Sequence, residues 1–268
     1  MKIVNFIGGL GNQCFQYLFY MYLKDNCPKE KIYGFYGCAS DCHNGLEIDK
    51  WFDVVLPSQP WFIIYLKKFL YLLKRLHIKN YIVDECNFNL NGILYDAYWQ
   101  NKFFFLDYLP CLIYKDIVLE NENKIIFEQM RKSNSVSLHI RRGDYLLPQN
   151  ALLYSNVCNK SYYQSALNII NINVESPQIY IFSDDIKWVK ENLNIKKAIY
   201  VDWNTGLNSF YDMYLMSCCR HHIIANSTFS FWAAILGEEK NSIIIYPKKW
   251  FNNGYNKPDI QPDNWISI

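Results

Sequence analysis

The chain has 268 residues, of which 51% are hydrophobic, 18% aromatic and 19% charged. This length and this apolar content suit two lobes with substantial cores and exclude a disordered chain. Lys and Arg number 27 against 25 Asp and Glu, so the formal charge of +2 argues against a nucleic-acid-binding protein. Any anion site must therefore be local.

Nine cysteines are scattered along the chain without the spacing of a disulfide framework, which favours a reducing cytoplasm. The apolar stretch that begins at Met1 is too short for a signal peptide and lacks a cleavage pattern, so we expect mature structure from the start. Cys38, Cys42 and His43, with Cys27 upstream, suggest a zinc site. No second ligand pair completes a tetrahedron, and we expect ordinary buried thiols and no metal.

Short apolar runs alternate with helical patterns throughout the chain. The predicted strands are Ile3–Ile7, Lys31–Tyr36, Tyr81–Asp84, Ile93–Trp99, Val136–Arg141, Gln178–Phe182, Ala198–Val201, His222–Ala225 and Ser242–Tyr246. Continuous apolar strands with helical spacers indicate parallel sheets covered on both faces, so the fold class is α/β. A helical pattern around Ile125 and Met130 precedes the strongest strand, and we place the boundary there, between lobes 1–131 and 132–268.

The first strand ends in Gly8-Gly-Leu-Gly-Asn-Gln13, before a helix with apolar residues at Phe15, Leu18 and Phe19. Such a turn lets a ligand approach the backbone and points free amides at it. It is no dinucleotide fingerprint, because Cys14 replaces the third glycine and no acidic residue follows at the usual distance. Asn12 and Gln13 at the helix start are equally typical of helix caps.

The segment Trp61–Leu76 combines aromatic residues and leucines with Lys67, Lys68, Lys74 and Arg75. It is too short and too charged to span a bilayer. Its composition is typical of an interfacial helix attracted to anionic lipid, which predicts peripheral contact at the inner face of the cytoplasmic membrane. The alternative, which we favour, is a lobe-covering helix with a solvated basic face.

The run Val136–Ile140 continues into Arg141-Arg-Gly-Asp-Tyr145, so positive charge emerges at the end of a buried strand. With a period of two, His139 and Arg141 lie on the face opposite Leu138. The planar fork of arginine suits phosphate or carboxylate oxygens, which predicts an anionic ligand at the strand end. The alternative is a structural pair of Arg142 with Asp144 around Gly143.

Two further strands end in polar residues. Asp184 and Asp185 follow a buried strand, where paired acids bind a metal, accept hydrogen bonds from a ligand such as guanine, or cap the following helix. The chain contains no D-x-D sequence, the usual clamp for a metal diphosphate. Asn226-Ser-Thr-Phe-Ser230 follows another strand and opens a helix that stops at Gly237, a ready site for phosphate.

Four motifs in this order resemble the α-1,2-fucosyltransferases of bacteria and animals: Gly8–Gln13, His139–Tyr145, Phe182–Asp185 and Asn226–Ala233. The segments Tyr98–Asn101 and Phe210–His221 also look like parts of this family, and the resemblance covers nearly the whole chain. Cys14 stands where methionine is usual and Phe231 where tryptophan is frequent. Neither departure touches a charged or hydroxyl group.

The resemblance implies a GT-B architecture, with two Rossmann-like lobes facing across a central cleft. It implies inverting, metal-independent transfer of L-fucose from GDP-β-L-fucose to the 2-hydroxyl of a terminal galactoside, in surface-glycan biosynthesis. By analogy Arg141 binds the β-phosphate, His139 contacts the nucleoside, and Asp184 or Asp185 reads guanine. The other expected donor contacts are Gly9, Gly11, Asn226, Ser227, Thr228, Phe229 and Ser230. Candidates on the acceptor side are Gln13, Trp99, Gln100 and Tyr145.

The expected catalytic residues are Arg141, Asn12 and Asp144. Arg141 stabilises the leaving diphosphate, which we expect to be the largest catalytic contribution. Asp144 is the nearest carboxylate that could act as a base, yet it equally suits a structural role, and Asn12 alone could orient the acceptor hydroxyl. Other GDP-sugar or heptose-type transferases and a non-catalytic nucleotide-sugar or glycan-binding protein are the rival hypotheses. Lactose, a type 1 or type 3 galactoside and a lipid-linked intermediate all fit as acceptor.

Overall fold

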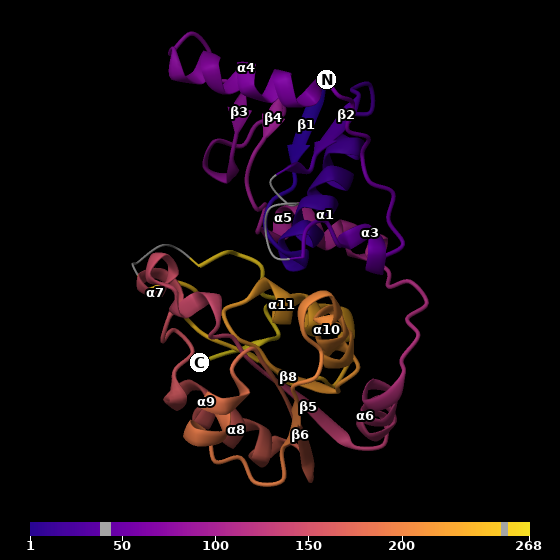
Figure 1. Ribbon diagram of the computed structural model, residues 1–268, viewed down its shortest axis with the longest axis vertical. Coiled ribbons are helices and arrows are strands. Elements are labelled where there is room, and N and C mark those ends of the chain that lie inside the picture. The colour runs from indigo at the N-terminus through magenta and orange to yellow at the C-terminus, as the bar shows by residue number, and fades with distance from the viewer. Residues whose placement is uncertain (38–43, 253–256) are drawn as a thin grey trace. The chain divides into compact units, whose positions relative to one another are not determined.

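The computed structural model describes residues 1–37, 44–252 and 257–268. It consists of two compact units, Met1–Ile117 and Val118–Ile268, each built on its own parallel sheet (Figure 1). The expected α/β class with two parallel sheets is confirmed. The division falls after Ile117, whereas the sequence placed it after residue 131, because the intervening helix packs against elements of the second unit.

The first unit contains a four-stranded sheet in the order β2-β1-β4-β3, with all neighbouring strands parallel. Its strands are β1 Lys2–Asn5, β2 Ile32–Phe35, β3 Ile82–Val83 and β4 Leu94–Tyr95. Its helices are α1 Leu10–Asn26, α3 Ile48–Trp51, α4 Ile63–Arg75 and α5 Lys102–Phe105, with short 3-10 helices η1 Glu85–Asn87 and η2 Leu106–Cys111.

The two faces of this sheet carry different helices, as the alternation of side chains along β1 requires. Ile3 and its register partner Leu94 lie on the face that α4 covers, where Ile63 and Leu70 complete a buried cluster. The opposite face packs against α1 and an aromatic core. The helix α4 therefore has one side on the sheet and the other side turned away from it (Figure 1).

The second unit contains a six-stranded sheet in the order β10-β9-β8-β5-β6-β7. Its strands are β5 Asn134–Ile140, β6 Pro177–Ser183, β7 Ile199–Val201, β8 His221–Ile223, β9 Ile244–Tyr246 and β10 Ile266–Ser267. Its helices are α6 Asn121–Arg131, α7 Pro148–Tyr154, α8 Lys160–Asn173, α9 Ile186–Asn192, α10 Phe210–Ser217 and α11 Thr228–Gly237, with 3-10 helices η3 Asp144–Leu146 and η4 Gly206–Asn208.

The strand order reverses beside β5, since the chain runs from β5 through β6 to β7 and then returns to β8 on the other side. A parallel sheet of this kind binds ligands beyond the carboxyl ends of its strands at such a switch point. Val136, Leu138 and Ile140 point into a core that α8 and α9 complete, whereas Ser137 and His139 are buried on the opposite face. This confirms the predicted division of side chains along β5.

All nine predicted strands form, with shorter bounds in most cases, and β10 was not predicted. β10 is an edge strand whose two residues are exposed, so it lacks the buried apolar run from which the other strands were predicted. Within the described residues, no helix has the length and apolar content needed to cross a bilayer.

Candidate functional site

Arg141 follows β5 at the switch point and is held between two carboxylates. Its Nη2 lies 2.8 Å from Asp144 Oδ1 and its Nη1 lies 3.0 Å from Asp184 Oδ2. Burial opposes the charge, but Asp184 and Asp144 outweigh it and raise the pKa of Arg141 above its ordinary value. The guanidinium is therefore a permanent cation whose orientation is set from two sides.

Arg142 points to a different partner from the one considered in the sequence. Its backbone N–H donates to Asp184 Oδ1 at 2.8 Å, and its Nε donates to Asp185 Oδ2 at 3.0 Å. Its guanidinium also lies 3.9 Å from the ring centre of Trp188. The alternative pair of Arg142 with Asp144 is thus wrong, because Asp144 binds Arg141 and Arg142 is fixed at the start of α9.

Asp185 caps α9, since its Oδ1 accepts from the Trp188 N–H at 3.1 Å. Burial works against its ionised form, but the Trp188 N–H and Arg142 lower the pKa of Asp185 below its ordinary value. Both aspartates considered for guanine recognition therefore already use their oxygens on the two arginines and on α9. The capping role that the sequence left open belongs to Asp185.

Gly143 is the residue that allows Asp184 to reach this loop. A Cβ at position 143 would lie 2.9 Å from Asp184 Oδ2 and 3.2 Å from its Cγ, closer than ordinary contacts. Any side chain here would push the carboxylate off Arg141 and off the Arg142 N–H. The loop conformation and the orientation of Arg141 are therefore coupled through Asp184.

His139 is buried one residue inside β5. Burial, and then the nearby charge of Arg141, lower the pKa of His139 to about 3, so the imidazole is neutral at physiological pH. Its ring centre lies 6.0 Å from that of Phe229, and its Nδ1 has no hydrogen-bond partner among the described residues. A buried polar atom without a partner is a natural contact point for a ligand or a water molecule.

The start of α11 lies beside this face of β5 and presents the N-terminus of a ten-residue helix. Ser227 is its cap, since the Ser227 Oγ accepts from the Phe229 N–H at 3.3 Å. The Ser230 hydroxyl is buried and donates to the Ser227 carbonyl. Thr228 is half-buried, and its hydroxyl makes no hydrogen bond to any residue in the described ranges. The Thr228 hydroxyl and the first-turn backbone N–H groups other than that of Phe229 are therefore the donors available to an anion.

Tyr145 joins the loop after β5 to the loop after β8. Its hydroxyl donates to the Asn226 carbonyl at 2.8 Å, its ring stacks on Tyr154, and burial raises the pKa of the hydroxyl. The Asn226 side chain in turn donates to the Trp250 carbonyl and accepts from the Cys158 thiol. Tyr145 and Asn226 thus hold the switch point together, and their polar atoms serve the protein itself.

The glycine-rich turn of the first unit is fixed from the helix that follows it. Gly8 has a φ of +75°, and a Cβ there would lie 2.5 Å from Asn12 Nδ2, so this position requires glycine. The Gln13 side chain is fully buried, donates to the carbonyls of Gly8 and Gly45, and accepts from the N–H groups of residues 47 and 48. Gln13 therefore cross-links two loops in this structure. Gly9 is the N-cap residue of α1, and Gly11 lies buried in its first turn.

Asn12, a candidate catalytic residue, and Gln100, a candidate on the acceptor side, lie in contact with each other. The Gln100 Nε2 donates to Asn12 Oδ1 at 3.0 Å, which leaves Asn12 Nδ2 without a partner among the described residues. Trp99 has a φ of +59° and is fully buried, with its ring stacked on Phe19 at a centroid distance of 3.7 Å. Trp99 thus belongs to the aromatic core, and Gln100 is the neighbour that reaches Asn12.

Asp212 on α10 is a partly buried acid that the sequence did not mark as a site residue. Its Oδ1 accepts from Asn204 Nδ2 at 2.8 Å, and Asn204 exchanges hydrogen bonds with Asn123. Burial raises the pKa of Asp212 to about 7, although the Asn204 hydrogen bond opposes this. An acid in the apolar run Phe210–Met216 was the available signal.

No group of three His, Cys, Asp or Glu side chains suited to a metal ion occurs within residues 1–37, 44–252 and 257–268. The seven cysteines that lie in these ranges are free thiols. Cys38, Cys42 and His43, the residues of the zinc alternative, lie outside the described residues.

The second unit combines an oriented arginine, a neutral buried imidazole and a helix N-terminus at one sheet edge. This arrangement suits an anionic ligand.

Comparison with known proteins agrees with this chemistry. Residues 71–268 match the sequence profile described as Glycosyl transferase family 11. An α-1,2-colitosyltransferase of Escherichia coli is 29% identical over 99% of this chain and 98% of its own length. The O-antigen biosynthesis glycosyltransferase WbnK of Escherichia coli is 39% identical over 58% of this chain and 48% of its own. The galactoside 2-alpha-L-fucosyltransferase SEC1 of Bos taurus is 32% identical over 40% of this chain and 29% of its own.

Proposed function

Because the chain belongs to glycosyl transferase family 11, we propose that it transfers L-fucose from GDP-β-L-fucose to the 2-hydroxyl of a terminal galactoside. The transfer inverts the anomeric centre to an α-1,2 linkage and needs no metal ion. The observation that carries this proposal is the position of Arg141, which is fixed by Asp144 and Asp184 at the switch point of the second sheet. Switch points of this kind are where nucleotides bind in open parallel sheets.

In this proposal the second unit binds the donor. Arg141 and the N-terminus of α11, with the Thr228 hydroxyl, bind the diphosphate and stabilise the charge that grows on it as the bond to the sugar breaks. The electron pair of that bond leaves with GDP, and the acceptor oxygen bonds to the anomeric carbon as its proton passes to solvent water. The neutral imidazole of His139 contributes its unpartnered Nδ1 to the nucleoside side of the donor.

The two aspartates after β6 have a supporting role in the same proposal. Asp184 orients Arg141 and Asp185 holds Arg142 at α9, so each acts on the donor through an arginine. Asp144 also lies against Arg141, and we assign it to positioning and not to proton transfer.

The first unit supplies the acceptor-side groups in this proposal. The Asn12 amide, which Gln100 orients through Oδ1, offers Nδ2 as a donor to the acceptor hydroxyl. Little base assistance is needed if the sugar has oxocarbenium character before the hydroxyl attacks. The names of two relatives, an O-antigen biosynthesis glycosyltransferase and a galactoside 2-alpha-L-fucosyltransferase, support a galactoside-containing glycan as acceptor.

A second donor deserves a test, because the relative that matches over nearly the whole chain is an α-1,2-colitosyltransferase. Colitose is L-fucose without its 3-hydroxyl. A site that hydrogen-bonds the 3-hydroxyl would reject colitose strongly, whereas an apolar contact there would accept both sugars. The ratio of the transfer rates from GDP-L-fucose and GDP-L-colitose therefore distinguishes a hydrogen bond to the 3-hydroxyl from an apolar contact at that position.

The experiment is a donor panel of GDP-L-fucose, GDP-L-colitose, GDP-D-mannose and an ADP-heptose, with GDP or ADP release measured in the presence of a chelator. We expect release from GDP-L-fucose that rises on addition of lactose or a type 1 or type 3 galactoside, with a product in α-1,2 linkage by NMR. Faster transfer from any other donor would replace the proposed donor. Donor binding in a thermal-shift assay without any turnover would identify a non-catalytic binding protein. Loss of transfer with the chelator would overturn metal independence.

A further inference from the structure

The outer side of α4 carries large apolar side chains that no described residue of the first unit covers. Ile63 and Leu70 are buried against the sheet, whereas the residues on the opposite side are exposed. The exposed fractions are 80% for Trp61, 64% for Tyr65, 53% for Phe69, 49% for Leu72 and 56% for Leu76. These positions recur at spacings of three and four, so they form one stripe along the helix.

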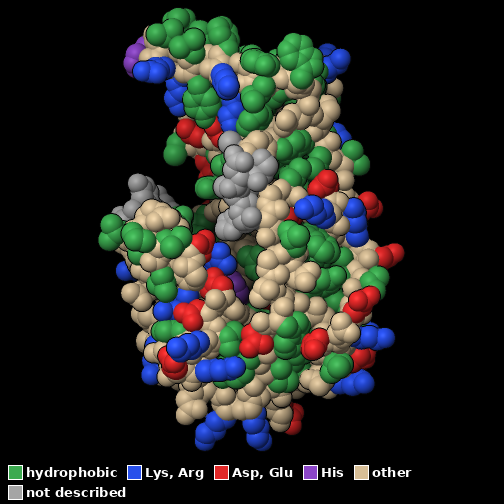
Figure 2. Space-filling view, viewed as in Figure 1, with side chains coloured by type: hydrophobic (Ala, Val, Ile, Leu, Met, Phe, Trp, Pro, Cys, Tyr) green, Lys and Arg blue, Asp and Glu red, His purple; other side chains and the backbone are tan. Residues whose placement is uncertain are grey.

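The charged residues of the segment that carries this stripe all have the same sign, and the nearest carboxylate, Asp96, accepts a hydrogen bond from the Tyr71 hydroxyl. Residues 54–83 contain no Asp or Glu, and Lys68, Lys74, Arg75 and Lys79 are exposed. The Lys67 ammonium lies 4.1 Å from the ring centre of Phe35, which draws it toward the sheet and away from the stripe. Figure 2 shows hydrophobic and basic side chains together over α4 at the top of the view.

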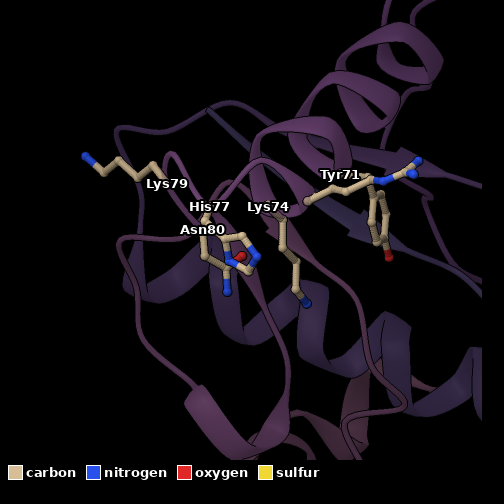
Figure 3. A pocket seen from close by; sticks show the side chains of 6 residues that line it. Tyr71, Lys74, His77, Lys79 and Asn80 are labelled. Atoms are coloured by element: carbon tan, nitrogen blue, oxygen red, sulfur yellow. The ribbon is translucent and has the colours of Figure 1, made fainter.

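A basic pocket continues this surface at the end of α4. It has a volume of about 710 Å³ and is lined by Tyr71, Lys74, Arg75, His77, Lys79 and Asn80. Figure 3 shows Lys74 extending between Tyr71 and the pair His77 and Asn80, while Lys79 extends the other way. Donors from several cationic side chains around one pocket suit the phosphate of a lipid headgroup.

We propose that the α4 face, defined as residues 61–79, docks on a membrane surface that contains anionic lipid. The aromatic and leucine side chains of the stripe enter the boundary between headgroups and acyl chains, and the pocket residues bind headgroup phosphates. The helix lies in the membrane plane, since its thirteen residues extend only about 20 Å. A surface of one charge sign around an apolar stripe complements anionic lipid better than it complements a second copy of itself, which would place like charges opposite each other.

The helix α4 has features of both alternatives considered for residues 61–76, a helix that covers its lobe and an interfacial helix. One side of α4 covers the sheet, as the favoured alternative predicted, but the exposed side is apolar as well as basic. A helix that only covered a sheet would expose polar residues at positions such as 65, 69 and 72. The proposal concerns binding alone and does not depend on the donor or acceptor.

Vesicle flotation of the full chain tests the proposal directly. Vesicles of phosphatidylcholine alone are compared with vesicles that also contain about 30 mol% phosphatidylglycerol, at about 0.1 M and about 0.5 M salt. We expect at least about tenfold more protein to float with the anionic vesicles at low salt, and most of that gain to vanish at high salt. Wild-type protein that stays with the unbound fraction in every condition would overturn the proposal.

Two variants locate the binding surface, and a third controls for general loss of exposed apolar residues. One replaces the stripe (Tyr65→Ser, Phe69→Ser, Leu72→Ser) and one replaces the charges (Lys68→Gln, Lys74→Gln, Arg75→Gln). The control replaces exposed apolar residues of the second unit, Ile125→Ser, Leu152→Ser and Ile172→Ser, whose exposed fractions are 62%, 86% and 82%. Each basic residue near an anionic surface increases the partition coefficient about fivefold, so the charge variant should bind vesicles about a hundredfold more weakly than wild type. The control should bind as wild type.

All these positions are exposed, and unchanged circular dichroism and thermal unfolding verify that each variant is folded. Equal flotation of the wild type and both α4 variants would refute the assignment of the face. Light scattering over a range of protein concentrations tests the alternative that the α4 face binds a second copy of the chain. A dimer that the stripe variant abolishes, without any flotation of the wild type, would assign the α4 face to a second copy of the chain and overturn membrane docking.

Discussion

Replacing Arg141 by alanine should abolish most transfer while leaving the protein folded. The change removes the cation that we place on the leaving diphosphate, and loss of one such donor reduces turnover by about 100- to 1000-fold, or about 2.7–4 kcal/mol of transition-state stabilisation. The change also breaks the ion pairs of Arg141 with Asp144 and Asp184. Because the Arg141 side chain is 27% exposed, solvent weakens these pairs, and their loss should lower the free energy of unfolding by about 1–2 kcal/mol. The kinetic effect thus exceeds the structural one.

The neighbouring arginine is a matched control for this prediction. Arg142→Ala breaks the pair with Asp185 and the contact with Trp188, so its stability loss should also be about 1–2 kcal/mol. Its turnover should fall by less than about tenfold, because Arg142 acts only on the loop and α9. Arg141→Lys keeps the charge but loses the two-sided fork, and should lie between wild type and Arg141→Ala.

The assay is GDP release from GDP-L-fucose with a galactoside acceptor, together with urea unfolding of each variant. Comparable stability losses with very different turnover would separate catalysis from folding. A folded Arg141→Ala that transfers within about tenfold of wild type would refute the role of Arg141. An equal kinetic loss in Arg142→Ala would show that the loop as a whole, and not the Arg141 cation, is responsible.

Three further predictions follow from the two units. Asp144→Asn keeps an oxygen for Arg141, so turnover should fall by less than about tenfold and the pH profile of turnover should not change. A loss above about a hundredfold, with a changed acidic limb of that pH profile, would identify Asp144 as the base. Gly8→Ala places a Cβ against Asn12 Nδ2 at a φ of +75°, so the variant should lose about 1–2 kcal/mol of stability. Transfer should become slower while the Kd for GDP stays the same. Weaker GDP binding by calorimetry would contradict the proposal that the second unit alone binds the nucleotide. Asp212 has a folded pKa of about 7 against an ordinary 3.8, so ionisation of the unfolded chain lowers wild-type stability as pH rises from about 4 to 7. Asp212→Asn removes that loss and should be more stable than wild type by up to about 4 kcal/mol at pH 8 and equal at pH 4 in urea unfolding. An equal gain at both pH values would contradict the assignment.

The strands could be predicted because each buried strand is a short apolar run between helical patterns. The face assignment along β5 also followed from its period of two, which puts Leu138 in one core and His139 on the other side. The partners of the loop residues could not be predicted in the same way. Arg141 and Arg142 are adjacent, and only the pairing of β5 with β6 brings Asp184 to the first and Asp185 to the second.

Residue type also misled the prediction where a polar side chain serves the backbone. Gln13 and Asn226 lie in motifs that resemble ligand-binding segments, but each uses its amide to tie loops together. Trp99 was expected to face the acceptor and is instead in the core, where its stacking on Phe19 depends on residues about eighty positions apart. Sequence spacing carries no information about such contacts.

The carboxylates around Arg141 are built-in competitors of any anion that approaches its guanidinium. Asp144 and Asp184 are tethered beside the guanidinium, so their effective concentration there far exceeds that of free phosphate or chloride in solution. A small anion that offers one contact gains little by displacing them. Under the proposed function, a nucleoside diphosphate sugar is anchored at several points, so it binds the guanidinium with net gain while the carboxylates stay beside it. The two ion pairs therefore favour a large anion with several contacts over a small one, and we expect high chloride or phosphate to inhibit the proposed transfer only weakly.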